Sequence, residues 1–214
     1  MFSLLLENPL YFLIVAAVLA LSLSLHEFAH AWTADRLGDP TPRSQGRVTL
    51  NPLAHLDPLG TLLLLLAGFG WGKPVMFDPF NLKNPRRDTI LIAIAGPLSN
   101  LVIALLVLLL FPWLPLPLII WRTVVGLNVT LAVFNLLPIY PLDGSRILAG
   151  LLSPRLAMEY EMTMQRYGFI ILLLLILPLA GGLSPLDALL GPLQSEIMLI
   201  LIRIVSTIHG ALGL

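Results

Sequence analysis

Long apolar stretches separated by short polar segments dominate the hydrophobic pattern of this chain. About 20 consecutive apolar residues match the hydrocarbon core of a bilayer in helical form. The pattern predicts about five transmembrane helices, at residues 9–36, 88–111, 118–138, 167–179 and 186–208. Pro9 suits the first turn of a helix, and Gly38-Asp39-Pro40 stops it. The expected fold class is therefore an all-α polytopic membrane protein.

The region between the first two expected spans, residues 37–88, contains one short apolar run at 61–71. Apolar runs of roughly 10–14 residues more often enter the bilayer and return than cross it. Basic residues flank the run on both sides, and the positive-inside rule places both groups on the cytoplasmic face. We therefore expect a re-entrant loop here, with short β-strands at 46–50 and 73–77 on the cytoplasmic side between the first two helices.

Composition agrees with a membrane protein: 57% of residues are hydrophobic, 11% are charged, and the mean hydropathy is +0.93. No hydrophilic stretch is long enough for a soluble domain. We expect one membrane-embedded domain over residues 1–214, with a core at about 9–150 that contains the polar motifs of the chain and accessory C-terminal helices at about 165–208. The formal net charge of zero implies no nucleic-acid partner. The absence of cysteine excludes thiolate ligands, disulfides and cysteine nucleophiles.

The chemistry of the chain centres on His26-Glu27-Phe28-Ala29-His30, near the end of the first apolar stretch. Residues four apart share a helix face, so His26 and His30 can bind one metal ion together. Glu27 lies about 100° around the helix, where its carboxylate can act on a water molecule at that ion. Two imidazoles and a carboxylate base are what a zinc hydrolase requires. Ionisable side chains at membrane depth usually face one another, a ligand or water.

Two histidines leave zinc short of one protein ligand. The candidates for the third are Asp143, His55 and His209. Asp143 is the strongest, because it directly follows a span that Pro138 and Pro141 interrupt. The His55-Leu56-Asp57 segment reads either as a turn-capping pair at the surface or as support for a metal site.

These motifs together resemble the site-2 protease family of intramembrane zinc metalloproteases (M50 type). The resemblance rests on the histidine motif followed by Asn135-Leu136-Leu137-Pro138 and Pro141-Leu142-Asp143-Gly144. The segments Gly46-Arg47, His55-Leu56-Asp57-Pro58 and Gly96-Pro97-Leu98-Ser99-Asn100 resemble its compact branch, without PDZ or CBS domains. The similarity covers most of residues 20–150.

The resemblance implies one Zn²⁺ per chain, held by His26, His30 and Asp143, with Glu27 as general base and Asn135 in contact with the substrate backbone. It implies a membrane-anchored protein substrate, cut within or beside a transmembrane segment. The expected location is a prokaryotic cell membrane, with the active site toward the cytoplasm. A divalent metal ion transporter is the alternative, because intramembrane His, Glu and Asp clusters also carry ions.

Overall fold

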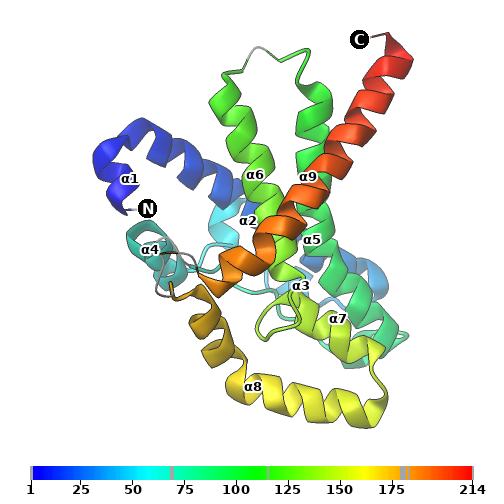
Figure 1. Cartoon of the computed structure of the whole chain (residues 1–214). Coiled ribbons are helices and arrows are strands. Elements are labelled where there is room, and N and C mark those ends of the chain that lie inside the picture. Colours follow the sequence, from blue (N-terminus) through cyan, green and yellow to red (C-terminus); the bar gives the residue numbers. More distant parts are fainter. Residues whose placement is uncertain (1, 68–69, 115, 179–181, 183, 214) are drawn as a thin grey trace.

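The computed structural model describes residues 2–67, 70–114, 116–178, 182 and 184–213. Its longer elements are α-helices, which Figure 1 colours along the chain. They are α1 (Phe2–Glu7), α2 (Pro9–Leu37), α3 (Thr41–Ser44), α4 (Pro58–Ala67), α5 (Pro85–Leu110), α6 (Leu118–Asn135), α7 (Asp143–Leu151), α8 (Pro154–Ile176) and α9 (Pro185–Leu212). Two short 3₁₀ helices, η1 (Pro52–Ala54) and η2 (Pro79–Asn81), complete the described secondary structure. The expectation of an all-helical membrane protein is confirmed.

Four of these helices, α2, α5, α6 and α9, are long and apolar enough to cross a membrane. They correspond to four of the five expected spans. The remaining one, 167–179, covers the second half of α8, which ends at Ile176, and residue 179 lies outside the described residues. The first half of α8 carries Arg155, Glu159, Glu161 and Arg166. These charges, and the shortness of the apolar half, leave α8 unlike a spanning helix.

The direction of α9 agrees with four membrane crossings and not with five. His209, near the end of α9, hydrogen-bonds through Nε2 to the carbonyl oxygen of Leu109 at the end of α5, over 3.0 Å. Its ring also packs edge-on against Trp113, with centroids 5.6 Å apart. The C-terminal end of α9 therefore lies beside the loop that joins α5 to α6, at the top of Figure 1. Five crossings would have placed it at the opposite end.

Helix α2 begins and ends where local chemistry requires. The side chain of Asn8 accepts a hydrogen bond from the backbone N–H of Tyr11, over 3.0 Å, and Pro9 occupies the first turn. At the other end Gly38 adopts a left-handed φ of 112°, and its N–H caps the carbonyls of Ala34 and Asp35. This helix carries the histidine motif, so the distance of the motif from the helix end sets the depth of the site in the membrane.

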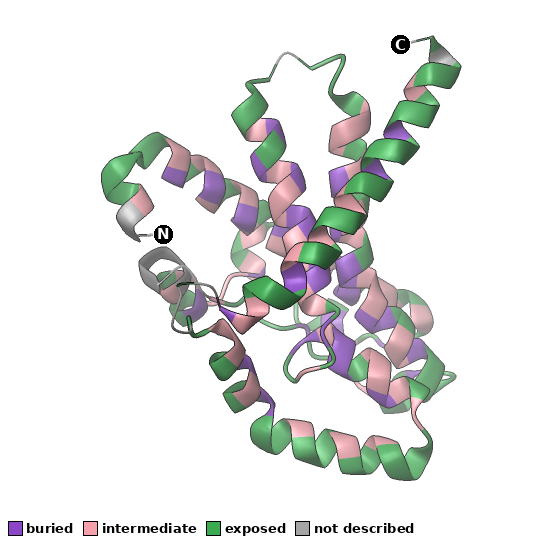
Figure 2. Ribbon diagram, viewed as in Figure 1, coloured by how far each residue is buried: buried purple, intermediate pink, exposed green. Residues whose placement is uncertain are grey.

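Many buried residues lie in the centre of the molecule, where α5 and α6 pack against α2 and against α9, as the purple segments in Figure 2 show. The largest cluster is apolar and joins α5, α6 and α9 to α8 and to the turn after α6: Ala104, Val125, Val129, Val133, Leu137, Leu142, Leu172, Leu190 and Leu201. Large apolar side chains such as Leu13, Leu106 and Leu199 remain exposed on the outer faces. A surface of this kind is stable when the surrounding medium is lipid.

The prediction of short β-strands at 46–50 and 73–77 is wrong for the part of the chain that the structure describes. These segments do not pair with each other, and the one isolated bridge joins Leu56 to Gly72. Pro74 has no N–H to donate, and Gly46 takes a left-handed φ of 67° that turns the backbone. The alternation of apolar and polar residues was therefore overridden by turn-forming residues.

The expected re-entrant run at 61–71 overlaps α4, and its residues 68 and 69 lie outside the described residues. Ten helical residues span about 15 Å, which is half the thickness of a hydrocarbon core. Helix α4 contacts α1, next to the start of α2. The ten described residues of α4 are thus too few to cross the bilayer, and entry of this loop into the bilayer stays a prediction.

Asp39 ties the end of α2 to the segment that leads into α5. Its side chain is fully buried and accepts hydrogen bonds from the N–H and hydroxyl of Thr41, from the Asn81 amide and from the N–H of Asp78. Burial raises the pKa of this carboxyl, but the hydrogen bonds outweigh burial and hold the pKa below its ordinary value of 3.8. The ionised form is therefore the one that the fold stabilises.

Candidate metal centre

Helix α2 delivers His26, Glu27 and His30 to one region of the interior. The two imidazole rings lie one turn apart, with centroids separated by 4.7 Å in an edge-to-face arrangement. His26 is 3% exposed and His30 is 7% exposed. Imidazoles this deeply buried require partners for both ring nitrogens.

Asp143 arrives from a different part of the chain, 117 residues after His26. Helix α6 ends at Asn135, and the turn that follows contains Pro138 and Pro141, which cannot continue a helix. Asp143 is then the first residue of α7. A Cβ atom on Gly144 would lie 2.2 Å from the carbonyl oxygen of Leu136, so this tight approach requires glycine. The turn thereby points the Asp143 carboxylate back toward α2.

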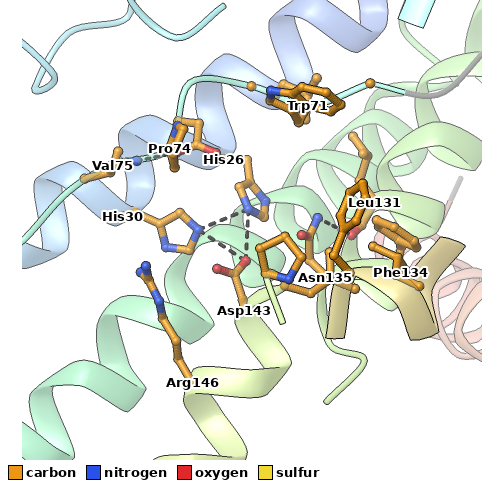
Figure 3. Close-up of a pocket in the computed structure, with 18 residues that line it drawn as sticks. His26, His30, Trp71, Pro74, Val75, Leu131, Phe134, Asn135, Asp143 and Arg146 are labelled. Atoms are coloured by element: carbon orange, nitrogen blue, oxygen red, sulfur yellow. Dashed lines mark hydrogen bonds and ion pairs between the residues drawn. The ribbon is translucent and has the colours of Figure 1, made fainter. Parts of the chain in front are cut away.

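Three ligand atoms converge at this point, as Figure 3 shows. The Nε2 atoms of His26 and His30 are 3.1 Å apart, and Oδ2 of Asp143 lies 3.1 Å from the first and 3.3 Å from the second. Ligands at zinc distances of about 2.0–2.1 Å in a tetrahedron are separated by about 3.3 Å. The triangle therefore has the size that one zinc ion requires, and these residues form a group that could hold a metal ion.

The outer ring nitrogens fix the direction of the inner ones. Nδ1 of His26 lies 2.7 Å from Oδ1 of Asn100, and Nδ1 of His30 lies 2.7 Å from the carbonyl oxygen of Ile92. Both partners are acceptors, so each Nδ1 carries the proton and each Nε2 presents a lone pair. Two lone pairs and a carboxylate facing one another are mutually repulsive, and a divalent cation between them removes that repulsion.

Gly96 of α5 provides the space for this group. A Cβ atom at Gly96 would lie 2.3 Å from Nε2 of His30 and 2.6 Å from Nε2 of His26. Any other residue would therefore push the imidazoles apart or occupy the position between them. The adjacent Pro97 and nearby Asn100 belong to the same helix, so α5 supplies both the gap and the support for His26.

A buried polar network, which sequence reasoning missed, continues behind Asn100. The Asn100 amide N–H₂ donates to Oδ1 of Asn128 on α6 over 2.9 Å, and the Asn128 amide donates to the Ser22 hydroxyl, also over 2.9 Å. Both asparagines are fully buried. Because Nδ2 of Asn100 is committed to Asn128, its Oδ1 must face His26. The sequence showed Asn128 only as a polar residue within an expected span.

Glu27 faces a cavity of about 360 Å³ beside the triangle. Its Oε2 accepts a hydrogen bond from the backbone N–H of Val75, over 3.2 Å. Figure 3 shows Trp71, Pro74 and Val75 on one side of the cavity and Leu131, Phe134 and Asn135 on the other. The carboxylate of Glu27 thus lies next to the metal ligands without belonging to the triangle that they form.

The remaining residues singled out in the sequence have other positions. His55 is fully buried, with Nε2 2.8 Å from the carbonyl oxygen of Thr49, so it is not a surface cap. Asp57 accepts from the N–H of Gly60 over 2.8 Å and caps α4. Asn135 lines the cavity, and its amide donates to the carbonyl of Leu131 over 2.9 Å. The structure brings neither His55 nor His209 into the metal group.

Comparison with known proteins relates this chain to a family of metallopeptidases. The family model for peptidase family M50 matches residues 116–175, which include Asn135 and Asp143. A Bacillus subtilis protein named "Putative zinc metalloprotease YwhC" is 41% identical over 180 residues, covering 77% of this chain and 80% of that protein. A Mycolicibacterium smegmatis protein named "Putative zinc metalloprotease Rip2" is 36% identical, covering 78% of this chain and 67% of that protein.

A more distant relative is "Zinc metalloprotease MJ0392" of Methanocaldococcus jannaschii, 26% identical over 92% of this chain and 48% of that protein. No solved structure gives a significant match. The extent of the similarity to the Bacillus subtilis protein, together with the family model, is sufficient to assign the family. The chain belongs to peptidase family M50, the site-2 protease family.

Proposed function

We propose that this protein is an intramembrane zinc metalloprotease that hydrolyses peptide bonds within or next to transmembrane segments of membrane-anchored proteins. The observation that carries the proposal is the convergence of His26, His30 and Asp143 at 3.1–3.3 Å, with Glu27 beside them on the wall of a cavity. One Zn²⁺ per chain would occupy the triangle. The protein would lie in a prokaryotic cell membrane.

The depth of the site favours a substrate that is itself in the membrane. His26 is eleven residues from the end of α2 at Leu37, or roughly 16 Å along the helix at 1.5 Å per residue. The basic residues around 36–47 and 83–87 support an orientation in which that end of α2 faces the cytoplasm. The active site would therefore open toward the cytoplasm, from within the bilayer.

The reaction follows from the groups in place. A zinc ion in the triangle would supply Lewis-acid polarisation of the scissile carbonyl and would lower the pKa of water. The Glu27 carboxylate would take the proton of the attacking water and return it to the leaving amine. Asn135, on the opposite wall of the cavity, would donate its second amide proton to the substrate backbone.

The cavity also sets what the substrate must look like. Its walls are mostly apolar, with Leu23, Leu131, Phe134, Leu142, Phe169 and Leu172 among the lining residues. An intact helix hides its peptide bonds in its own hydrogen bonds, so the target segment must unwind before Glu27 can act on it. Apolar segments containing helix-breaking residues are therefore the preferred class.

Replacing Glu27 with Gln tests the proposal. The amide cannot accept a proton, so turnover of a model transmembrane substrate should fall by about 10²–10⁴-fold, while the zinc content of the purified protein stays unchanged. Retained cleavage by this variant would remove Glu27 from the role of base.

The same preparation separates the proposed peptidase from the alternative of a metal transporter. Chelator should abolish cleavage by the wild-type protein, and added zinc should restore it. Zinc flux into liposomes that contain the protein, without cleavage of any substrate, would favour the transporter instead.

A further inference from the structure

The segment that covers Glu27 is held by a buried arginine that the proposed reaction does not use. We call residues 70–75 the strap. It forms one wall of the cavity, and Gly72 lies directly over Glu27: a Cβ atom there would be 3.7 Å from Oε1 and 3.8 Å from Cγ of Glu27. The strap ends at Val75, whose N–H donates to Oε2 of Glu27.

The backbone of the strap is joined to the segment that follows η1. The N–H of Lys73 donates to the carbonyl of His55 over 2.8 Å, and an isolated bridge joins Gly72 to Leu56. Pro74 contributes no N–H. An isolated two-stranded pairing is only marginally stable, so side-chain contacts to the strap add to its position.

Arg47 makes such a contact. Its guanidinium donates through Nη1 to the carbonyl oxygen of Ala54 and through Nη2 to that of Lys73, so it joins the η1 turn to the strap. Arg47 is 3% exposed, and it forms no ion pair with any described residue. A buried cation held by carbonyls alone is costly. Burial lowers the pKa of Arg47, and the charge of Glu27 opposes that shift.

Resting on the function proposed above, we propose that Arg47 is a positioning residue for Glu27. It seats the strap, and the seated strap holds Oε2 through the Val75 N–H, which leaves Oε1 free to face the reacting water. The fork of a guanidinium can reach two carbonyls at once, which a single ammonium group cannot do. Loss of Arg47 would thus release the general base without touching a metal ligand.

The absence of cysteine from the chain allows a direct measurement of strap position. Val75 is 4% exposed, so a single cysteine in the Val75→Cys protein should react slowly with a maleimide. Arg47→Gln in this background removes two charge-assisted hydrogen bonds and should speed alkylation at least about tenfold. Arg43→Gln is the matched control, because Arg43 pairs with Asp35 at the surface and should leave the rate unchanged.

Turnover by the otherwise native, zinc-loaded protein tests the second half of the inference. Arg47→Gln should lower kcat by about 10–100-fold, the cost of misplacing a catalytic group by about 1 Å, with zinc affinity unchanged and KM within about threefold. Arg47→Lys should recover only part of either effect, and it replaces the Gln variant if that variant fails to fold. Proportional changes in zinc affinity would indicate general disruption and overturn the inference.

Two results overturn the inference whatever the fate of the proposed function. An unchanged alkylation rate in a folded Arg47 variant would show that the arginine does not seat the strap. Glu27→Ala should also speed alkylation at position 75, because Val75 loses its acceptor; no change there would show that the strap does not hold Glu27. If the wild-type protein cleaves nothing, the proposed function fails. The two alkylation rates still test whether Arg47 holds the strap and whether the strap holds Glu27.

Discussion

The hydrogen bond from His26 to Asn100 gives the sharpest quantitative prediction about the metal centre. Oδ1 of Asn100 accepts a hydrogen bond from Nδ1 of His26, and the two atoms are 2.7 Å apart. Replacing Asn100 with Ala removes this acceptor. Both side chains are buried, so water does not readily replace the lost partner. His26 would then be free to rotate or to change tautomer, and either change turns its lone pair away from the metal.

Loss of such a supporting bond typically lowers metal affinity by about 10–100-fold. At about 1.4 kcal/mol per factor of ten, this corresponds to about 1.4–2.8 kcal/mol, which agrees with the cost of about 1–3 kcal/mol for an unsatisfied buried donor. We therefore expect the zinc Kd of Asn100→Ala to rise by that factor. The assay is competition for zinc with a chelator of known affinity, on purified protein in detergent.

Asn128→Ala is the matched control for this experiment. It removes the partner of the Asn100 amide but leaves the bond between Asn100 and His26 intact. The same buried network is perturbed, so a comparable loss of stability is expected with a smaller loss of zinc affinity. A folded Asn100→Ala protein that binds zinc within about twofold of wild type would refute the argument that Asn100 orients the ligand.

Three further predictions concern space, ligation and stability. Gly96→Ala should reduce zinc affinity by more than about 100-fold, because its Cβ would meet both imidazoles, whereas Gly126→Ala, with open space around its Cβ, should not. Asp143→Ala should lower the bound zinc measured by elemental analysis; full occupancy would reject Asp143 as a ligand. Asp39→Asn should destabilise the protein by about 2–3 kcal/mol in denaturant titrations at neutral pH. Because the folded-state pKa of Asp39 is lowered, this difference is present above pH 3.8 and shrinks as pH falls below it; a pH-independent difference would contradict the assignment.

Hydropathy predicted the spanning helices well where length and composition agreed. The expected span at 9–36 is α2 within one residue at its end, and the start of the span at 118 is also the start of α6. The expected span at 167–179 is not confirmed, because the apolar half of α8 is continuous with a charged half in a single helix. Apolar length alone does not show whether a segment crosses a membrane or lies against other helices.

The predicted strands failed for a related reason. An alternating pattern reports which residues suit a pleated surface, but a strand exists only when a neighbouring segment offers its hydrogen bonds. Around Arg47 and Pro74 the backbone bonds go instead to turns, to a guanidinium and to Glu27. No local sequence pattern predicts that a guanidinium or a carboxylate will bind the backbone of these segments.

Sequence by itself determined the bilayer as the surrounding medium, the helices long enough to cross it, and the pairing of His26 with His30 on one helix face. These properties follow from composition and from the 3.6-residue period, and both are local. Only the tertiary structure decided that Asp143 completes the triangle at 3.1–3.3 Å, that Gly96 leaves room for it, and that Arg47 reaches the strap over Glu27. Such contacts depend on how segments far apart in the sequence pack together, and the residues at single positions do not reveal that packing.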